Sequence, residues 1–239
     1  ESIKKMGGKV LTGQQVKSIQ AVDNQIVIYT TKLQLKCDLL INCAGLYSDN
    51  IAAMAGLKLD VQIIPFRGEY WLVKPEKEYL VKHLVYPVPD PAFPFLGVHF
   101  TRMTNGEIEC GPNAVFTFKR EGYGKTDFSM KDTFDALTYK GTWKLFGKHW
   151  RKGIDEYKRA FSKRLFVRAL QKMMPTIIVN DVQPARAGVR AQAIDFEGNM
   201  IDDFKIMKHN GNIHVLNAPS PAATSCLAIA DEIVSVVIN

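Results

Sequence analysis

The sequence of 239 residues lacks any apolar run close to the roughly 18 residues that a membrane-spanning helix needs. Its first ten residues, ESIKKMGGKV, also lack the apolar core of a signal peptide. Nothing in the printed sequence therefore marks the chain for secretion. The apolar content is nevertheless 46%, which is enough for one large domain or two small ones with a substantial core.

Cysteine is scarce, and its spacing excludes two classes of small domain. The four cysteines never form a C-x-x-C pair, which argues against a zinc site and against a disulfide framework. We therefore predict no metal and expect reduced, buried thiols. These residues are Cys37, Cys43, Cys110 and Cys226.

Helix-turn-helix, zinc-finger and RNP-like patterns are also missing, so we expect no nucleic-acid partner. The net charge of +7 is nevertheless uneven, because the segment 119–172 holds 15 Lys and Arg against 6 Asp and Glu. Ser129 to Asp132 resembles a capping box that opens a helix in this segment. Such helices are either simply solvated or contact an anionic membrane surface, and both interpretations stay open. Their apolar stripe comprises Phe146, Trp150, Ile154, Tyr157, Phe161, Leu165 and Ala169.

Two segments predict the same construction, in which a strand and a turn of small residues lead into a helix. In LLINCAGLYSDNIAAMAG, Ser48 is predicted to cap a helix that ends at Gly56. In NIHVLNAPSPAATSCLAIADEI, Ser220 is the predicted N-cap and Pro221 the first helical residue. The small residues at 222–224 leave backbone N–H groups accessible, which suits an anion or a polarised carbonyl. An ordinary capped helix on a sheet has the same pattern.

The fold class predicted from these elements is α+β. One domain is expected from 1–57 with 184–239, and a second from 58–183. The G-x-G-x-x-G fingerprint of dinucleotide sites occurs nowhere, so the main phosphate cradle is missing and we expect the chain to be the C-terminal part of a longer protein. Alternating patterns predict strands at 10–11, 16–19, 25–30, 39–41, 66–73, 96–101, 107–110, 186–193, 200–207 and 212–216.

Six strings of the sequence are distinctive: LLINCAGLYSD, PFRGEYW, YPVPDPAFPFLGVHFT, GPNAVFTFKREGY, ARAGVRAQA and HVLNAPSPAATSCLAIA. They resemble one family, the FAD-dependent oxidoreductases of the D-amino-acid oxidase and glycine oxidase type, and within it the L-2-hydroxyglutarate dehydrogenases and oxidases. The resemblance extends over nearly the whole chain. It implies an incomplete Rossmann-like FAD domain and an antiparallel-sheet substrate domain with helices.

The resemblance assigns FAD as the cofactor and several residues as its contacts. Val16 resembles the residue whose backbone meets the adenine, and Ala44 and Gly45 resemble the turn that approaches the phosphates or ribityl chain. A small residue and a glycine allow such a close backbone approach. Gly188 resembles a flavin-facing position. The helix start that faces the pyrimidine end of the flavin corresponds to Pro221, Ala222, Ala223 and Thr224.

The implied substrate is a small dicarboxylate that bears a hydroxyl group, so its site needs cations and a proton acceptor. Arg190 resembles the arginine that holds an α-carboxylate by a bidentate fork. His99 is the predicted base, although a histidine hydrogen-bonded within a sheet fits the same pattern. The predicted pocket contacts are Arg67, Tyr86, Asn113 and Arg186. The other histidines match no motif, and we interpret them as incidental.

These residues lead to a hypothesis of FAD-dependent oxidation of L-2-hydroxyglutarate to 2-oxoglutarate, with hydride transfer to flavin N5 and electrons passed to oxygen or a quinone. One alternative is an oxidase of an amino acid or another 2-hydroxy acid. A second alternative is a non-catalytic fragment that does not hold FAD. A third interpretation makes 119–172 a peripheral membrane contact. The expected location is the cytoplasm or inner-membrane surface of a bacterium, or the mitochondrion of a eukaryote.

Overall fold

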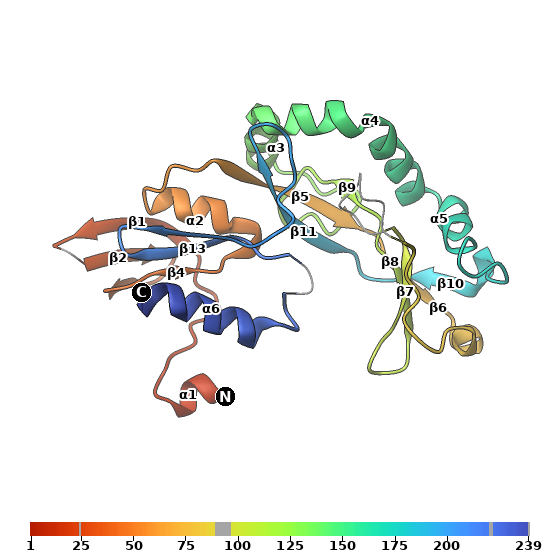
Figure 1. Ribbon diagram of the computed structural model, residues 1–239, viewed down its shortest axis with the longest axis horizontal. Helices are drawn as coiled ribbons and strands as arrows, with labels where there is room; N and C mark the ends of the chain where they lie inside the picture. The colour runs from red at the N-terminus through yellow and green to blue at the C-terminus, as the bar shows by residue number, and fades with distance from the viewer. Residues whose placement is uncertain (24, 89–96, 220–221, 239) are drawn as a thin grey trace. The chain divides into compact units, whose positions relative to one another are not determined.

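The computed structural model describes residues 1–23, 25–88, 97–219 and 222–238. It confirms an α+β fold, and its chain contacts divide into two compact units. The terminal unit consists of Glu1–Leu59 with Phe204–Asn239, and the central unit consists of Asp60–Asp203. Figure 1 shows the elements of both units, which are described separately below.

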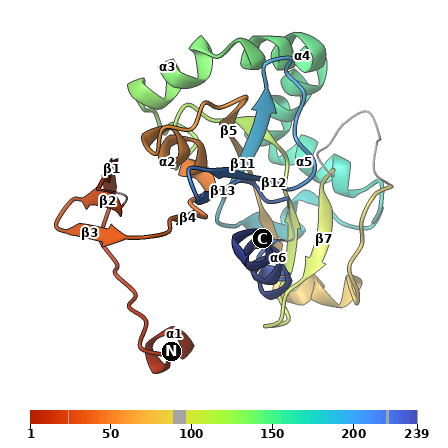
Figure 2. The same ribbon diagram turned by 60° about the vertical axis from the view of Figure 1, so that its left-hand side comes forward.

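The terminal unit contains two three-stranded sheets. The first is an antiparallel meander of β1 (Val16–Val22), β2 (Gln25–Thr30) and β3 (Gln34–Cys37), after which the chain continues into β4, as Figure 2 shows. The predicted strand at 10–11 is wrong, and β3 was not predicted. A short helix, α1 (Ser2–Lys5), precedes the meander.

The second sheet of the terminal unit has the order β12 (Lys205–His209), β13 (Asn212–Asn217), β4 (Ile41–Asn42), with β13 parallel to β4. Figure 1 shows α2 (Ser48–Met54) and α6 (Cys226–Ile238) on opposite sides of this sheet. Ile213 and Val215 pack with α6 in one core cluster. Since side chains alternate along a strand, His214 between them faces the other side.

Both predicted helix starts in this unit need correction. Helix α2 has Tyr47 as its N-cap, and the Ser48 hydroxyl instead lies 3.4 Å from the Leu216 carbonyl oxygen, to which it donates. Gly56, with φ of +86°, follows the helix end as predicted. Helix α6 begins at Cys226 rather than near Ser220. The residues before it form hydrogen-bonded turns, and Ser220 and Pro221 lie outside the described residues.

The central unit contains two further sheets. One has the order β11 (Gly188–Asp195), β5 (Val61–Gly68), β9 (Val115–Phe116). The other has the order β10 (Val182–Pro184), β6 (Trp71–Val73), β8 (Ile108–Gly111), β7 (His99–Arg102). The single strand predicted at 66–73 is therefore two strands, because the chain passes from one sheet to the other at Glu69 and Tyr70.

Three helices carry the basic segment, and α4 packs against β9 and β11 of the first sheet (Figures 1 and 2). They are α3 (Met130–Thr138), α4 (Lys140–Phe161) and α5 (Lys163–Leu170). Ser129 caps α3 as predicted, because its side chain accepts a hydrogen bond from the Asp132 backbone N–H. The Asp132 carboxylate accepts from the Arg120 backbone N–H at 2.9 Å, instead of from Ser129 as a capping box requires. Short 3₁₀ helices lie at Gly45–Tyr47, Pro75–Leu80 and Val179–Asp181.

Two hydrophobic clusters form the core of the central unit. Phe100, Phe166 and Leu170 belong to the cluster between the β10-β6-β8-β7 sheet and α5. Ile64 and Leu145 belong to the cluster between the β11-β5-β9 sheet and α4. No described helix is long and apolar enough to cross a membrane.

The second boundary between the units differs from the sequence-based division. That division placed residues 184–203 with the C-terminal segment, whereas the contacts place them in the central unit. The cause is the strand pairing, since β11 pairs with β5 along its whole length, from Gly188 opposite Gly68 to Asp195 opposite Val61. The roles assigned to the two domains remain predictions.

The cysteines are free thiols, but the expectation that all four are buried is wrong. Cys110 is buried, and burial raises the pKa of its thiol to about 12. Cys43 and Cys226 are exposed, and Cys37 is partly buried. Exposure of Cys43 follows from its place in the turn after β4, which is the first feature of the candidate site.

Candidate active site

The turn after β4 is held from within by buried polar side chains. The Asn42 side-chain oxygen accepts from the Ala44 N–H at 3.1 Å, and its amide nitrogen donates to the Ser48 carbonyl oxygen at 2.8 Å. Asn42 and Ser48 are buried, whereas Cys43, Ala44 and Gly45 are exposed. The backbone of the turn is therefore accessible while its conformation is fixed from below.

This turn has the shape that close approach to a ligand requires. Gly45 has a φ of +54°, a conformation that L side chains rarely adopt, and a Cβ built there would meet no atom within 4 Å. Open space beyond an accessible backbone is what a bulky group such as a dinucleotide cofactor needs. The chain's own residues therefore fit the predicted approach of FAD to Ala44 and Gly45.

The other predicted cofactor contacts occupy less distinctive places. Val16 begins β1 opposite Thr30 and is partly buried. Ala222 is partly buried and its N–H donates to the Pro219 carbonyl oxygen, whereas Ala223 and Thr224 are exposed. These residues form a turn, so the predicted exposed helix N-terminus at 222–224 is wrong. Pro221 lies outside the described residues.

In the central unit, Arg190 and Gly188 project from the same side of β11, since they are two residues apart on one strand. The ring of Tyr70 covers this side, because a Cβ built on Gly188 would lie 3.4 Å from its Cε2 atom. Arg190 keeps exposed surface, yet partial desolvation lowers the pKa of its guanidinium, and the Tyr70 phenol acts in the opposite direction. The guanidinium remains a cation, and its contact with a substrate carboxylate stays a prediction.

His99 has the geometry of a general base. Its Nδ1 lies 3.0 Å from the Gly97 carbonyl oxygen, so in the neutral ring Nδ1 carries the proton and Nε2 keeps its lone pair. The ring stacks on Tyr86 with centroids 4.4 Å apart and planes at 25°. Burial lowers the pKa of His99, and the hydrogen bond to Gly97 opposes that shift. A neutral imidazole with an open lone pair can accept a hydroxyl proton.

The Tyr70 ring contacts β8, which pairs with the His99 strand β7, and β11, which carries Arg190. Gly111 pairs with His99 between β8 and β7, and a Cβ at Gly111 would lie 2.9 Å from Tyr70 Cδ1. The same tyrosine ring contacts Gly188 on β11, two residues before Arg190. Sequence reasoning missed Tyr70, although the string RGEYW, an aromatic pair after a glycine, marks a break between strands.

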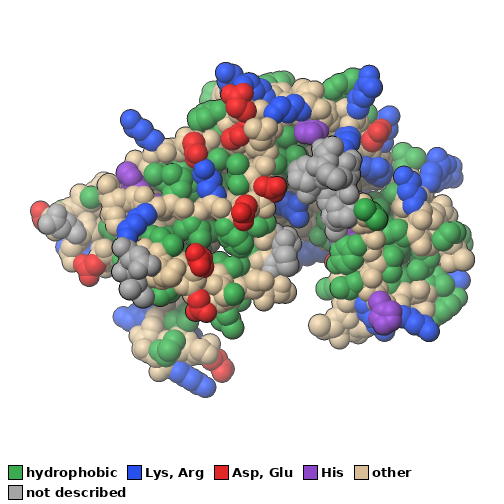
Figure 3. Space-filling view, in the orientation of Figure 1, with side chains coloured by type: hydrophobic (Ala, Val, Ile, Leu, Met, Phe, Trp, Pro, Cys, Tyr) green, Lys and Arg blue, Asp and Glu red, His purple; other side chains and the backbone are tan. Residues whose placement is uncertain are grey.

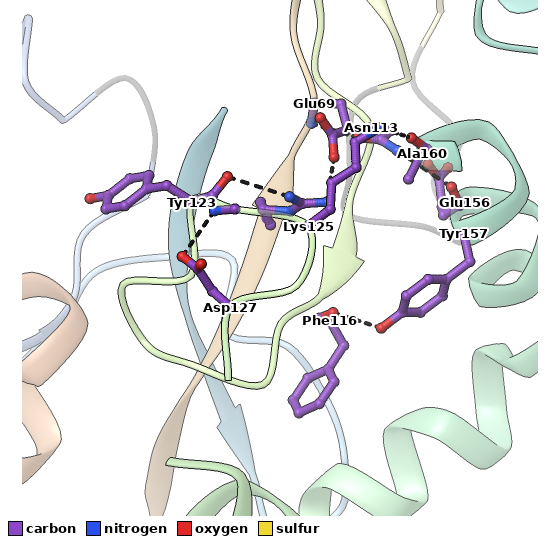
Figure 4. A network of polar contacts seen from close by, with 11 residues as sticks. Glu69, Asn113, Phe116, Tyr123, Lys125, Asp127, Glu156, Tyr157 and Ala160 are labelled. Carbon is purple, nitrogen blue, oxygen red and sulfur yellow. Dashed lines mark hydrogen bonds and ion pairs between the residues drawn. The ribbon is translucent and has the colours of Figure 1, made fainter. Parts of the chain in front are cut away.

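Two other predicted contacts belong to a buried network, shown in Figure 4. Arg67 is 4% exposed, forms an ion pair with Glu69 and donates to the Tyr123 carbonyl oxygen at 3.4 Å. Asn113 accepts from the Glu69 N–H at 2.7 Å. Both side chains thus have partners within the protein, and their contact with a substrate carboxylate stays a prediction.

Arg186 differs from Arg67 in being exposed. Its guanidinium lies over the ring of Tyr123, 5.7 Å from the ring centroid. In sequence, Arg186 comes two residues before the start of β11. Its contact with a substrate carboxylate stays a prediction. Among the described residues, no group of three His, Cys, Asp or Glu side chains is arranged to hold a metal ion.

The central unit also has a cavity of about 420 Å³ under α4. Its walls are mostly apolar and include Phe66, Phe116, Phe146, Trp150 and Ile154. Neither His99 nor Arg190 lines it. A polar substrate needs charged partners, and the predicted residues His99 and Arg190 lie outside this apolar cavity.

Comparison with known proteins identifies the family of the chain. A family model described as FAD dependent oxidoreductase matches residues 1–236. L-2-hydroxyglutarate dehydrogenase of Indibacter alkaliphilus is 51% identical over 230 residues, covering 96% of this chain and 58% of the relative. The mitochondrial L-2-hydroxyglutarate dehydrogenase of Homo sapiens is 45% identical over 254 residues, covering 98% and 55%. The chain spans little more than half the length of these relatives.

Solved structures show the same fold at low sequence identity. An L-α-glycerophosphate oxidase of Mycoplasma pneumoniae with FAD bound matches with a TM-score of 0.68 at 18% identity, covering 99% of this chain and 53% of that one. Glycine oxidase of Geobacillus kaustophilus matches with a TM-score of 0.55 at 15% identity, covering 95% and 50%. With the family model matching nearly every residue, the chain belongs to the FAD-dependent oxidoreductase family.

Proposed function

We propose that the full-length gene product oxidises L-2-hydroxyglutarate to 2-oxoglutarate with FAD as cofactor. Support comes from the curated relatives of that name, which are 45% and 51% identical over nearly the whole chain. The observation that carries the proposal is Tyr70, whose ring contacts both Gly111, the strand partner of His99, and Gly188, beside Arg190. In this proposal His99 on β7 is the base and Arg190 on β11 is the carboxylate-binding cation, and the two strands belong to different sheets of the central unit.

The reaction removes a hydride from C2 of the substrate and a proton from its hydroxyl group. FAD, when bound, supplies the acceptor for the hydride at N5. Arg190 binds the α-carboxylate and thereby orients C2 and its hydroxyl group. Nε2 of His99 accepts the hydroxyl proton, so the oxygen becomes the carbonyl oxygen of the product. Arg186 pairs with the distal carboxylate.

The residues that we propose for FAD binding are those with accessible backbone or little side chain. Ala44 and Gly45 present a fixed turn, and Val16, Gly188 and 222–224 contribute further contacts. Oxygen and a quinone are the proposed alternatives for the final electron acceptor. The proposed compartment depends on the organism. In a eukaryote it is the mitochondrion, as in the name of the human relative. In a bacterium it is the cytoplasm or the surface of the inner membrane.

Substrate turnover by the full-length gene product with FAD tests this proposal. L-2-hydroxyglutarate, lactate and glycine are compared at equal concentration, with bound flavin quantified from its visible absorbance. Preference for L-2-hydroxyglutarate supports two carboxylate contacts, whereas activity on glycine alone identifies an amino-acid oxidase of the same fold. Protein without flavin absorbance or turnover would identify the non-catalytic alternative.

We also propose that the basic helices contact a membrane surface. Trp143, Trp150 and Phe161 of α4 are exposed, and Lys and Arg side chains gather along α4 and α5, as Figure 3 shows. Exposed aromatic residues beside cations suit the interface of an anionic bilayer. Sedimentation with phosphatidylserine vesicles and with phosphatidylcholine vesicles tests this contact. Binding only to the anionic vesicles, weakened by salt, is the expected result, and no binding at any salt concentration eliminates it.

A further inference from the structure

The histidine most deeply buried in the chain is one that no sequence motif singled out. His214 on β13 is 0% exposed and pairs in parallel register with Asn42 on β4. Its Nδ1 atom lies 3.2 Å from the amide nitrogen of Asn42, whose side chain is also buried. The contact joins a residue of the C-terminal segment to the turn that begins at Asn42.

The hydrogen bonds of Asn42 determine which nitrogen of His214 carries the proton. The Asn42 side-chain oxygen accepts from the Ala44 N–H, and its nitrogen donates to the Ser48 carbonyl oxygen. If the amide were turned over, two donors would meet at Ala44 and two acceptors at Ser48. The amide nitrogen must therefore donate to His214, and Nδ1 must accept. His214 is thus neutral, with its proton on Nε2. Burial lowers its pKa, with a smaller contribution from His209, and both favour this neutral form.

We propose that His214 is a positioning residue that fixes Asn42 and, through it, the accessible backbone of the turn for FAD. The FAD part of this inference rests on the proposed function. Asn42 makes three contacts with one planar amide, and His214 supplies the one that comes from outside the turn. Without that acceptor, the amide loses its fixed rotamer and the Ala44 and Gly45 backbone loses its preset conformation.

Two substitutions at position 214 separate this role from simple packing. His214→Asn keeps an oxygen acceptor near the place of Nδ1, and the lost Nε2 group has no partner among the described residues. His214→Leu keeps a buried side chain but removes the acceptor. We expect His214→Leu to raise the FAD dissociation constant about tenfold, which corresponds to about 1 to 1.5 kcal/mol of lost hydrogen bonding. The FAD dissociation constant of His214→Asn should stay within about twofold of the wild-type value.

The FAD dissociation constant of the full-length gene product is measured by flavin fluorescence, with thermal melting of the apoprotein in parallel. Ile233→Val is the matched control, because Ile233 packs in the α6 cluster on the other side of the sheet from His214. We expect this control to lower stability slightly and to leave FAD affinity unchanged. Equal FAD affinity for wild type and His214→Leu would overturn the inference. If His214→Leu does not fold, Asn42→Ala removes the same contact from the other partner, and unchanged affinity there has the same meaning.

A second measurement needs no cofactor. Nitrogen-15 chemical shifts of the His214 ring in this chain report the tautomer, and we expect an unprotonated Nδ1 and a protonated Nε2 at neutral pH. A proton on Nδ1 would contradict the inference directly. If wild type binds no FAD while the tautomer is as expected, the proposed function fails and the Asn42–His214 contact stands as a structural feature of the turn.

Discussion

Two arginines on paired strands of the central unit show how position decides what a cation does. Arg67 on β5 lies opposite Val189, and Arg190 on β11 lies opposite Phe66. Opposite residues share a side of a sheet and consecutive residues alternate, so the two arginines project from opposite sides. Arg67 is buried with Glu69, whereas Arg190 keeps exposed surface beside Tyr70.

The difference leads us to propose a structural role for Arg67 and a binding role for Arg190. The Arg67 charge is already neutralised by a carboxylate within the protein, so removing either partner leaves the other buried without its counter-ion. The Arg190 guanidinium instead keeps exposed surface and lies in the field of the Tyr70 phenol. Arg67 should therefore control stability and Arg190 should control substrate binding.

The largest effect is expected from Arg67→Met. This change leaves the Glu69 carboxylate buried without a counter-ion, so the free energy of unfolding should fall by about 3 to 5 kcal/mol. Urea denaturation followed by circular dichroism measures the loss. The double variant with Glu69→Gln is the control, and it should recover most of the stability. An unfolding free energy for Arg67→Met equal to that of wild type would contradict the structural role.

Arg190→Met should produce the complementary result. Loss of a bidentate contact to the substrate carboxylate should lower kcat/KM for L-2-hydroxyglutarate about 100-fold, while the unfolding free energy changes by less than about 0.5 kcal/mol. Steady-state kinetics of the full-length gene product with FAD measures the first quantity. A large loss of stability with unchanged kinetics would reverse the roles assigned to the two arginines.

The family resemblance predicted Arg190 as the α-carboxylate contact and Arg67 as a further pocket contact, and three-dimensional packing shows how different their surroundings are. The sequence did predict the α+β class, the Ser129 cap and the stop at Gly56, because each depends on neighbouring residues. The roles of Arg190 and His99 came from the family resemblance and stay predictions. The sequence did not predict Tyr70, whose role depends on two glycines that are distant in sequence, Gly111 and Gly188.

The helix at the C-terminal end shows a second limit of the sequence. Ser220 and Pro221 match the preferences of a helix start, yet α6 begins only at Cys226. Intrinsic preference is a weak guide when nearby residues can form hydrogen-bonded turns instead, as Ala222 and Ser225 do. His214 was interpreted as incidental for a related reason, since its partner Asn42 is 172 residues away in sequence.

The dependence of kcat/KM on pH tests His99, the proposed base, beside Arg190, the proposed binding cation. Burial lowers the pKa of His99 from its ordinary value of 6.5, so its basic form persists to a lower pH than in a free histidine. We expect kcat/KM to be constant above neutrality and to fall about tenfold per pH unit once the pH drops below the lowered pKa. His99→Gln should remove this acid limb. An acid limb with its midpoint above 6.5 would contradict the assignment of His99 as the base.

The smallest effect on kcat/KM is expected at Tyr70, whose hydroxyl is proposed to act with Arg190 and not with Arg67. Tyr70→Phe keeps the ring that packs on Gly111 and Gly188, so only the hydroxyl beside Arg190 is lost. If this hydroxyl helps Arg190 to hold the substrate carboxylate, kcat/KM should fall about fivefold, the value of about one kcal/mol of hydrogen bonding.

The same substitution in two arginine backgrounds decides where the hydroxyl acts. In the Arg190→Met background, Tyr70→Phe should have almost no further effect on kcat/KM, because the carboxylate contact is already lost. In the Arg67→Met background, Tyr70→Phe should still lower kcat/KM about fivefold, when kcat/KM is calculated for the protein that remains folded. Equal losses in both backgrounds would mean that the phenol acts independently of Arg190. The coupling energy from this double-mutant cycle therefore measures directly whether Tyr70 and Arg190 bind one carboxylate together.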